Sequence, residues 1–288
     1  MPAALVLIDK QPGWTSHDVV AKLRGILGTR KIGHAGTLDP MATGLLVLGV
    51  DGGTKILQFI SGSDKQYIAT IRLGAATHTD DAEGDVVSSA SARLITATQI
   101  DAEIGKLTGE ITQVPSSVSA IKVDGKRAYD LVRDGKDVEL KGRKVTVSNF
   151  QRTADPRSVE EFLDFDVVVD CSSGTYIRAL ARDIGSALGV GGHLTALRRT
   201  KIDGFDVANA TEIDQPVVLL PLVDAAQALF GSISLTQDQA RDIVHGKRIS
   251  LEASGLVAAT WNGELLAVLE PVGSQLKSVV VFPEVFSA

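Results

Sequence analysis

The chain has 288 residues, of which 44% are hydrophobic, and its formal net charge is −6 at pH 7. This length allows a substantial core and lies near the size at which one core gives way to two, so we expect a large domain and a small one. No apolar run reaches the roughly 20 residues of a membrane span, and the N-terminus lacks signal-peptide features, so we expect a cytoplasmic protein without a membrane partner.

Residues 15–28, TSHDVVAKLRGILG, are predicted to form an amphipathic helix. Thr15 and Asp18 match a capping box at its start, and Gly28 is typical of a C-terminal stop. The apolar positions that share one face at helical spacing are Val19, Val20, Leu23, Ile26 and Leu27.

The next segment, GHAGTLDPMATG at residues 33–44, combines three glycines with the pair Asp39 and Pro40. Glycine permits crowded backbone geometry, and proline biases the preceding residue away from the helical region, so the Asp39 carboxylate is expected on a stiff turn. The apolar run LLVLGV follows and predicts a buried strand closed by DGG. From the residues alone, this DP pair is either an ordinary turn initiator or the carrier of a functional carboxylate.

Residues 66–74, QYIATIRLG, alternate as a half-buried strand does, with Tyr67 on the inward face. Charge is uneven in the region that follows. Residues 80–110 are mainly acidic, whereas residues 122–144 hold eight bases against five acids, counted along the printed sequence. The net charge alone argues weakly against a nucleic-acid partner, but this distribution allows a locally basic surface.

Residues 163–189 are predicted to form a strand, a Ser-Ser-Gly turn and a helix, with Tyr176 and Arg178 in the first turn of the helix. KVTVSNF at residues 144–150 is a further alternating strand. Because strands and helices mix without a regular βαβ rhythm, we predict an α+β fold on a mainly antiparallel sheet flanked by helices. From residue 228 the pattern changes to a short helix and several short strands, so the predicted domains are residues 1–227 and 228–288.

Several classes of chemistry lack their motifs. The sequence has no P-loop, no H-E-x-x-H and no Cys/His spacing for zinc, and its five histidines are dispersed. The single cysteine, Cys171, can form no internal disulfide. We therefore expect neither a metal nor a cofactor.

Taken together, these motifs resemble those of the TruB family, the bacterial tRNA pseudouridine-55 synthases. The similar segments are DKQPGWTSHDVV, KIGHAGTLDPMATGLLVLGV, KQYIATIRLG, TDDAEG, QVPSSVSAIKVDGKRAYDLVRDG, CSSGTYIRALARDIG and GGHLTALRRT. They cover most of residues 5–204, and the C-terminal part resembles a small RNA-binding β domain of the PUA type. The chain departs from the family pattern at Gln11, His78, Ser116 and Val118.

The resemblance implies a pseudouridine synthase fold and isomerisation of one uridine in the T-loop of tRNA, by a monomer that needs no cofactor. It implies that Asp39 is the catalytic nucleophile or base, that Arg178 keeps Asp39 ionised, and that Tyr67 stacks on the uracil and assists proton removal. His34 would fill the space left by the flipped base. The remaining substrate contacts that the resemblance implies are Tyr176, Leu197, Lys10, Asp81, Lys122 and Arg198.

One alternative keeps the fold and the RNA but loses the chemistry: a non-catalytic chaperone that binds and folds tRNA. The intact set Asp39, Tyr67 and Arg178 argues for the enzyme. A small-molecule lyase that uses Asp39 is a second alternative, but it would need neither the basic segments nor an RNA-binding domain.

Overall fold

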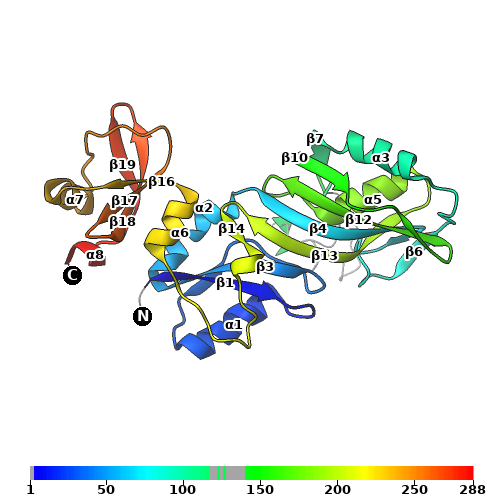
Figure 1. Cartoon of the computed structure of the whole chain (residues 1–288), viewed down its shortest axis with the longest axis horizontal. Helices are drawn as coiled ribbons and strands as arrows, with labels where there is room; N and C mark the ends of the chain where they lie inside the picture. The colour runs from blue at the N-terminus through cyan, green and yellow to red at the C-terminus, as the bar shows by residue number, and fades with distance from the viewer. Residues whose placement is uncertain (1–2, 117–121, 124–125, 128–139, 288) are drawn as a thin grey trace. The chain divides into compact units, whose positions relative to one another are not determined.

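The computed structural model describes residues 3–116, 122–123, 126–127 and 140–287 (Figure 1). Two compact units share the chain: the first comprises Met1–Pro40, Gly44–Gly62 and Lys201–Ala288, and the second comprises Met41–Thr43 and Ser63–Thr200. The predicted domain boundary at residue 228 falls inside the first of these units and stays a prediction. None of the helices in the described ranges is long and apolar enough to cross a membrane.

In the described residues the helices are α1 (Ser16–Leu27), η1 (Asp51–Lys55), α2 (Leu57–Ser61), α3 (Ala97–Lys106), α5 (Ile177–Ala187), η2 (Val207–Asn209), α6 (Leu222–Leu229), α7 (Gln237–Val244) and α8 (Glu284–Ser287). The strands of the first unit are β1 (Ala4–Lys10), β2 (Ile32–His34), β3 (Thr43–Val50), β14 (Phe205–Asp206), β15 (Leu220–Pro221), β16 (Gly231–Ser234), β17 (Val257–Trp261), β18 (Glu264–Val272) and β19 (Gln275–Val281). Those of the second unit are β4 (Lys65–Leu73), β5 (Ala75–Thr77), β6 (Val86–Ser89), β7 (Gly109–Gln113), β8 (Lys122–Val123), β9 (Lys126–Arg127), β10 (Arg143–Arg152), β11 (Arg157–Val159), β12 (Phe162–Cys171) and β13 (Gly192–Ile202).

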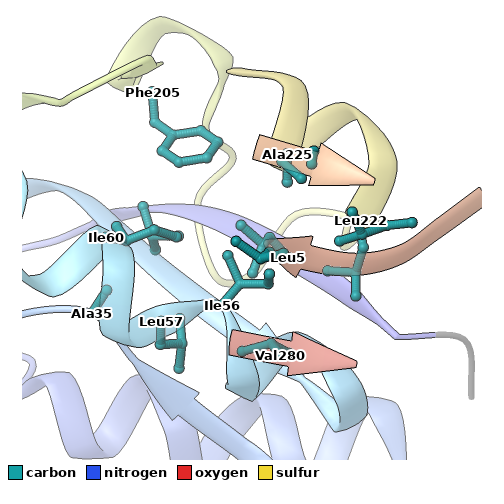
Figure 2. Packing of buried hydrophobic residues seen from close by; sticks show 14 of the residues in the cluster. Leu5, Ala35, Ile56, Leu57, Ile60, Phe205, Leu222, Ala225 and Val280 are labelled. Carbon is teal, nitrogen blue, oxygen red and sulfur yellow. The ribbon is translucent and has the colours of Figure 1, made fainter. Parts of the chain in front are cut away.

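In the first unit, β1 lies between β15 and β3, and β2 pairs with the other edge of β3. All these pairs are antiparallel. The predicted run LLVLGV is the end of β3, and its residues are buried, as a continuous apolar run requires. Figure 2 shows how Leu5 of β1 packs with Ile56, Leu222 and Val280, so residues from both ends of the sequence share one hydrophobic core.

Helix α1 begins and ends as predicted. Thr15 and Asp18 form a capping box, and Gly28 adopts the left-handed conformation at φ 65° that glycine tolerates best. The predicted apolar face is correct for Val19, Val20 and Leu23 but wrong for Ile26, which is 48% exposed. Helical spacing defines a face, but it does not say how far along the helix the packing partner extends.

In the second unit the strand order is β13-β4-β12-β10-β7. The pairs β4–β12, β12–β10 and β10–β7 are antiparallel. Helix α5 packs on β4, and α3 packs on β10 and α5 (Figure 1). The predicted alternation in β4 is confirmed, because Tyr67, Ala69, Ile71 and Leu73 are buried while Ile68 is 46% exposed. Tyr67 lies opposite Val169 of β12.

The C-terminal residues form a separate four-stranded sheet in the order β16-β17-β18-β19 (Figure 1). Strand β16 is parallel to β17, and the other pairs are antiparallel. Ala240 and Ile243 of α7 pack with Leu266 and Leu276 in the core of this sheet. The predicted α+β class with a small C-terminal β domain is therefore confirmed.

Candidate active site

Ser16, at the start of α1, holds the loop that carries Asp39 from one side. The Leu38 N–H donates to Ser16 Oγ at 2.9 Å, and Ser16 Oγ donates to the Leu38 carbonyl at 3.2 Å. Ser16 is fully buried, so these bonds have no competition from water. The residue directly before Asp39 is thus fixed through both of its main-chain polar groups.

Pro40, the residue after Asp39, is held from a second side. Its carbonyl accepts hydrogen bonds from the Gly13 N–H at 2.9 Å and from the Lys10 ammonium at 3.2 Å. Lys10 is 1% exposed and also donates to the carbonyls of Trp14 and Gln11. The stiffness expected from glycine and proline is therefore reinforced by the segment of residues 10–16.

This arrangement shows where two predicted site residues lie. The half-buried side chain of Asp39 lies between two anchored neighbours. Lys10 points its ammonium at main-chain carbonyls of its own unit, and its predicted contact with RNA stays a prediction. Ser16, the fully buried first residue of α1, was not predicted as an anchor.

His34 ends β2 in the same unit and pairs with Leu48 of β3. Its ring lies edge-to-face with the ring of His17 on α1, with the ring centroids 5.5 Å apart. His34 is half-buried, whereas His17 is exposed. The side chain predicted to stack in place of the flipped base is therefore supported by a second imidazole from the first turn of a capped helix.

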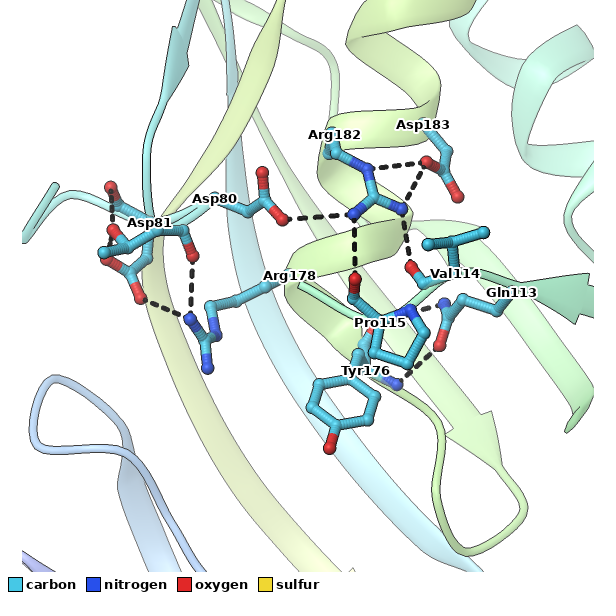
Figure 3. A network of polar contacts seen from close by, with 10 residues as sticks. Asp80, Asp81, Gln113, Val114, Pro115, Tyr176, Arg178, Arg182 and Asp183 are labelled. Carbon is cyan, nitrogen blue, oxygen red and sulfur yellow. Dashed lines mark hydrogen bonds and ion pairs between the residues drawn. The ribbon is translucent and has the colours of Figure 1, made fainter. Parts of the chain in front are cut away.

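In the second unit, Arg178 lies in the first turn of α5 and is only 6% exposed. Its Nη1 donates to the Thr79 carbonyl at 2.7 Å and lies 3.4 Å from Asp81 Oδ2 (Figure 3). Asp81 is 2% exposed, and its carboxylate also accepts the Glu83 N–H. Burial of an arginine is costly unless an acid and hydrogen bonds compensate it, so the TDD loop holds this guanidinium in place.

Asp81 is predicted as a substrate contact, and in the structure its carboxylate faces Arg178. The neighbouring Asp80 pairs with Arg182, with 3.3 Å between Oδ2 and Nη1. Burial raises the pKa of the Asp80 carboxyl, while Ser116, Arg182 and Arg178 act in the opposite direction. Asp80 and Arg182 were not predicted as site residues. The available signal was the spacing of Arg178 and Arg182, four residues apart on one helix face.

Tyr67 and Leu197, both 8% exposed, belong to β4 and β13 of the same sheet. Thr43 Oγ1 donates to the Leu197 carbonyl at 3.5 Å. The pKa of Lys65, two residues before Tyr67, is lowered to about 8 by burial and then by the nearby charge of Arg199.

Arg198 is half-buried in β13. Lys122 has its backbone in β8, opposite Arg127, and its side chain is outside the described residues. Val118 is outside them as well. Within the units the structure brings together Arg178 with Asp81, and Lys10 with the residue after Asp39.

Three family models match the chain. The TruB family pseudouridylate synthase N-terminal domain matches residues 24–177, the tRNA pseudouridylate synthase B C-terminal domain matches residues 178–220, and the tRNA pseudouridine synthase II C-terminal model matches residues 230–283. The PUA type expected for the last segment stays a prediction.

Curated relatives match over nearly the whole length. The tRNA pseudouridine synthase B of Leifsonia xyli subsp. xyli is 50% identical over 293 residues, covering 98% of this chain and 97% of its own. That of Mycolicibacterium paratuberculosis is 51% identical over 288 residues, covering 97% of each chain. That of Corynebacterium glutamicum is 52% identical over 285 residues, covering 96% of this chain and 95% of its own.

Two solved structures share the fold. An H/ACA RNP bound to a substrate RNA containing 2′-deoxyuridine has a chain with a TM-score of 0.70 at 23% identity, covering 97% of this chain and 84% of its own. A Cbf5-Nop10-Gar1 complex has one with a TM-score of 0.69 at 24% identity, covering 98% of this chain and 86% of its own. The predicted pseudouridine synthase fold is therefore confirmed.

Proposed function

Because the chain belongs to the TruB family of pseudouridylate synthases, we propose that it isomerises uridine 55 in the T-loop of tRNA, with Asp39 as the catalytic carboxylate. The observation that carries the proposal is the anchoring of Leu38 and Pro40 on either side of Asp39. A group that reacts must be held before the substrate arrives, because its alignment then costs nothing during the reaction.

The reaction breaks the N1–C1′ bond of uridine and forms a C5–C1′ bond. The proton on C5 leaves, and N1 gains one, so no electrons enter or leave and no water is consumed. One carboxylate suffices for this chemistry, whereas glycoside hydrolysis normally uses two. Attack of Asp39 at C1′, attack at C6 and proton removal at C2′ are all compatible with a single ionised aspartate.

The other groups take supporting roles. A carboxylate in a closed site stays ionised when a cation lies nearby, and we assign that role to Arg178. His34 is assigned to stack in the space that the flipped base leaves, which offsets part of the few kcal/mol that unstacking costs. Tyr176 and Leu197 are assigned to line the base pocket. We assign the reaction to the cytoplasm.

Positional mapping tests this function. An unmodified tRNA transcript incubated with the protein should gain one pseudouridine, at position 55. Binding of the transcript without any pseudouridine would support the non-catalytic chaperone instead, and pseudouridine at another position would show that the assigned target is wrong.

The Tyr67→Phe variant tests the role of the Tyr67 hydroxyl. The phenyl ring keeps the stacking surface but cannot move a proton, so kcat should fall about 10²- to 10⁴-fold, the usual contribution of a positioned acid or base. The KM for tRNA should change little. Steady-state rates over a range of tRNA concentrations give kcat and KM, and an unchanged kcat would show that Tyr67 only stacks.

A basic hollow on the first unit is suited to RNA phosphates. Arg24 and Arg30 line it together with Gly25, Gly28 and Thr29, at the end of α1. Both arginines are exposed, and residues 31–33 connect Arg30 to His34. Phosphate contacts supply much of the affinity for RNA without reading sequence, so an acidic protein needs such local basic surfaces.

The double variant Arg24→Gln and Arg30→Gln should weaken tRNA binding and reduce the slope of log K against log salt by about 1.4, because each neutralised single-strand phosphate accounts for roughly 0.7 of that slope. The control is Arg93→Gln with Arg157→Gln, which changes net charge equally at residues paired with Glu161 and Asp166. Equal slopes for both double variants would show that the hollow does not bind phosphates.

A further inference from the structure

Gln113, a buried residue at the end of β7, makes two hydrogen bonds to the main chain of Tyr176. The side chain of Gln113 is 1% exposed. Its Nε2 donates to the Tyr176 carbonyl at 3.0 Å, and the Tyr176 N–H donates to Gln113 Oε1 at 2.8 Å. Figure 3 shows the amide of Gln113 facing this backbone. One side chain thus bonds both main-chain polar groups of a pocket residue, whose carbonyl also accepts the Leu180 N–H at 3.3 Å.

Tyr176 needs such a partner because it is the N-cap of α5. Its backbone is extended, at φ −103° and ψ 109°, and no side-chain cap hydrogen bond is made there. The preceding Ser-Ser-Gly turn is closed by the Thr175 N–H and the Thr175 hydroxyl, which donate to the Ser172 carbonyl at 3.4 and 3.0 Å. These bonds close the turn at Thr175, whereas the Tyr176 N–H itself is bonded by the amide of Gln113.

Arg143 holds the ring of the same tyrosine. It lies directly opposite Gln113 in the pairing of β10 with β7. Its guanidinium carbon is 4.6 Å from the centroid of the Tyr176 ring, in cation–π geometry. A cross-strand pair therefore fixes Tyr176 twice, through its backbone by Gln113 and through one ring face by Arg143.

We infer that Gln113 is a positioning residue for the isomerisation, which acts by fixing the Tyr176 ring against the target base. The inference rests on the proposed function, in which Tyr176 lines the base pocket. A ring displaced by about 1 Å still allows tRNA to dock through its phosphates, but it misplaces the uracil for the reaction. Loss of the Gln113 hydrogen bonds should therefore lower kcat, because it displaces the Tyr176 ring.

The test is a double-mutant cycle between Gln113→Met and Tyr176→Ala, measured as single-turnover rates of tritium release from tRNA labelled at uracil C5. Methionine keeps the volume and removes both hydrogen bonds. Gln113→Met alone should lower the rate about 10- to 100-fold with little change in KM. In the Tyr176→Ala background the same change should have less than about a twofold effect, because the ring that it positions is already gone.

Gln66→Met is the matched control. Gln66 also makes two side-chain hydrogen bonds within this sheet, to Asp170 and from Thr200. The Gln66→Met variant should have a lower free energy of unfolding in urea and an unchanged kcat. If Gln113→Met does not fold, Gln113→Asn replaces it in the cycle, because the shorter amide stays polar but cannot reach both main-chain groups of Tyr176.

The outcomes separate the two proposals. Normal turnover in Tyr176→Ala would overturn the pocket role assigned under the proposed function. Slow turnover in Tyr176→Ala, combined with effects that multiply in the double variant, would overturn the positioning role of Gln113 and leave the pocket role intact. Effects on kcat that are non-additive in the double variant, with KM unchanged, support both proposals.

Discussion

Asp39→Asn should abolish pseudouridine formation, with a fall in single-turnover rate of about 10⁴-fold or more, while tRNA binds within a few-fold of wild type. Asparagine preserves the size of the side chain and removes the negative charge that every proposed route requires. The anchors of the loop are main-chain groups of Leu38 and Pro40, so the substitution leaves them in place. Tritium release from labelled tRNA measures the rate, and filter binding measures the affinity.

The matched control is Asp224→Asn, an exposed aspartate in the first turn of α6. It changes net charge equally and should leave turnover unchanged. If Asp39→Asn weakened tRNA binding as much as turnover, the carboxylate would be needed to build or dock the loop, and its catalytic role would be wrong.

Arg178→Lys should lower kcat by about 10²- to 10³-fold, the usual effect of removing one preorganised electrostatic group. Lysine keeps the charge but lacks the planar guanidinium, whose Nη1 contacts both the Thr79 carbonyl and Asp81. The free energy of unfolding should also fall by about 2 kcal/mol, because hydrogen bonds that involve a charged group contribute about 1.5–3 kcal/mol each. Saturating kinetics and urea unfolding give the two values.

Arg72→Lys separates the two effects. Arg72 makes a two-point contact with Asp164 between β4 and β12, at 2.7 Å for each bond. Its replacement should cost stability without slowing turnover. If Arg178→Lys slowed the reaction no more than Arg72→Lys at similar stability, Arg178 would serve the fold alone.

Local sequence signals predicted much of this fold. The capping box at Thr15, the alternation around Tyr67 and the apolar run of β3 each determine structure through neighbours within a few residues. Ile26 shows the limit of such signals, because its exposure depends on where packing along α1 stops. The strand pairings depend on residues far apart in the chain and were not predicted.

The candidate site was predicted by resemblance more than by physical reasoning. Spacing alone could not show that Arg178 faces Asp81, 97 residues earlier, or that the carbonyl after Asp39 accepts a hydrogen bond from Lys10. Tyr176 was predicted in the first turn of α5 but is its N-cap, and this part of the prediction was wrong. The backbone of Tyr176 is hydrogen-bonded to Gln113, 63 residues away, and no local pattern reveals this contact.

The central claim is that this chain isomerises uridine 55 of tRNA, and the stoichiometry of tritium release tests it most directly. With excess protein, a tRNA transcript labelled with tritium at C5 of uridine 55 should release one equivalent of tritium, because only C5 of the target loses its hydrogen. A uniformly labelled transcript with cytidine at position 55 should release none. No release from well-folded tRNA, or equal release from uniformly labelled transcripts with uridine and with cytidine at position 55, would contradict the account.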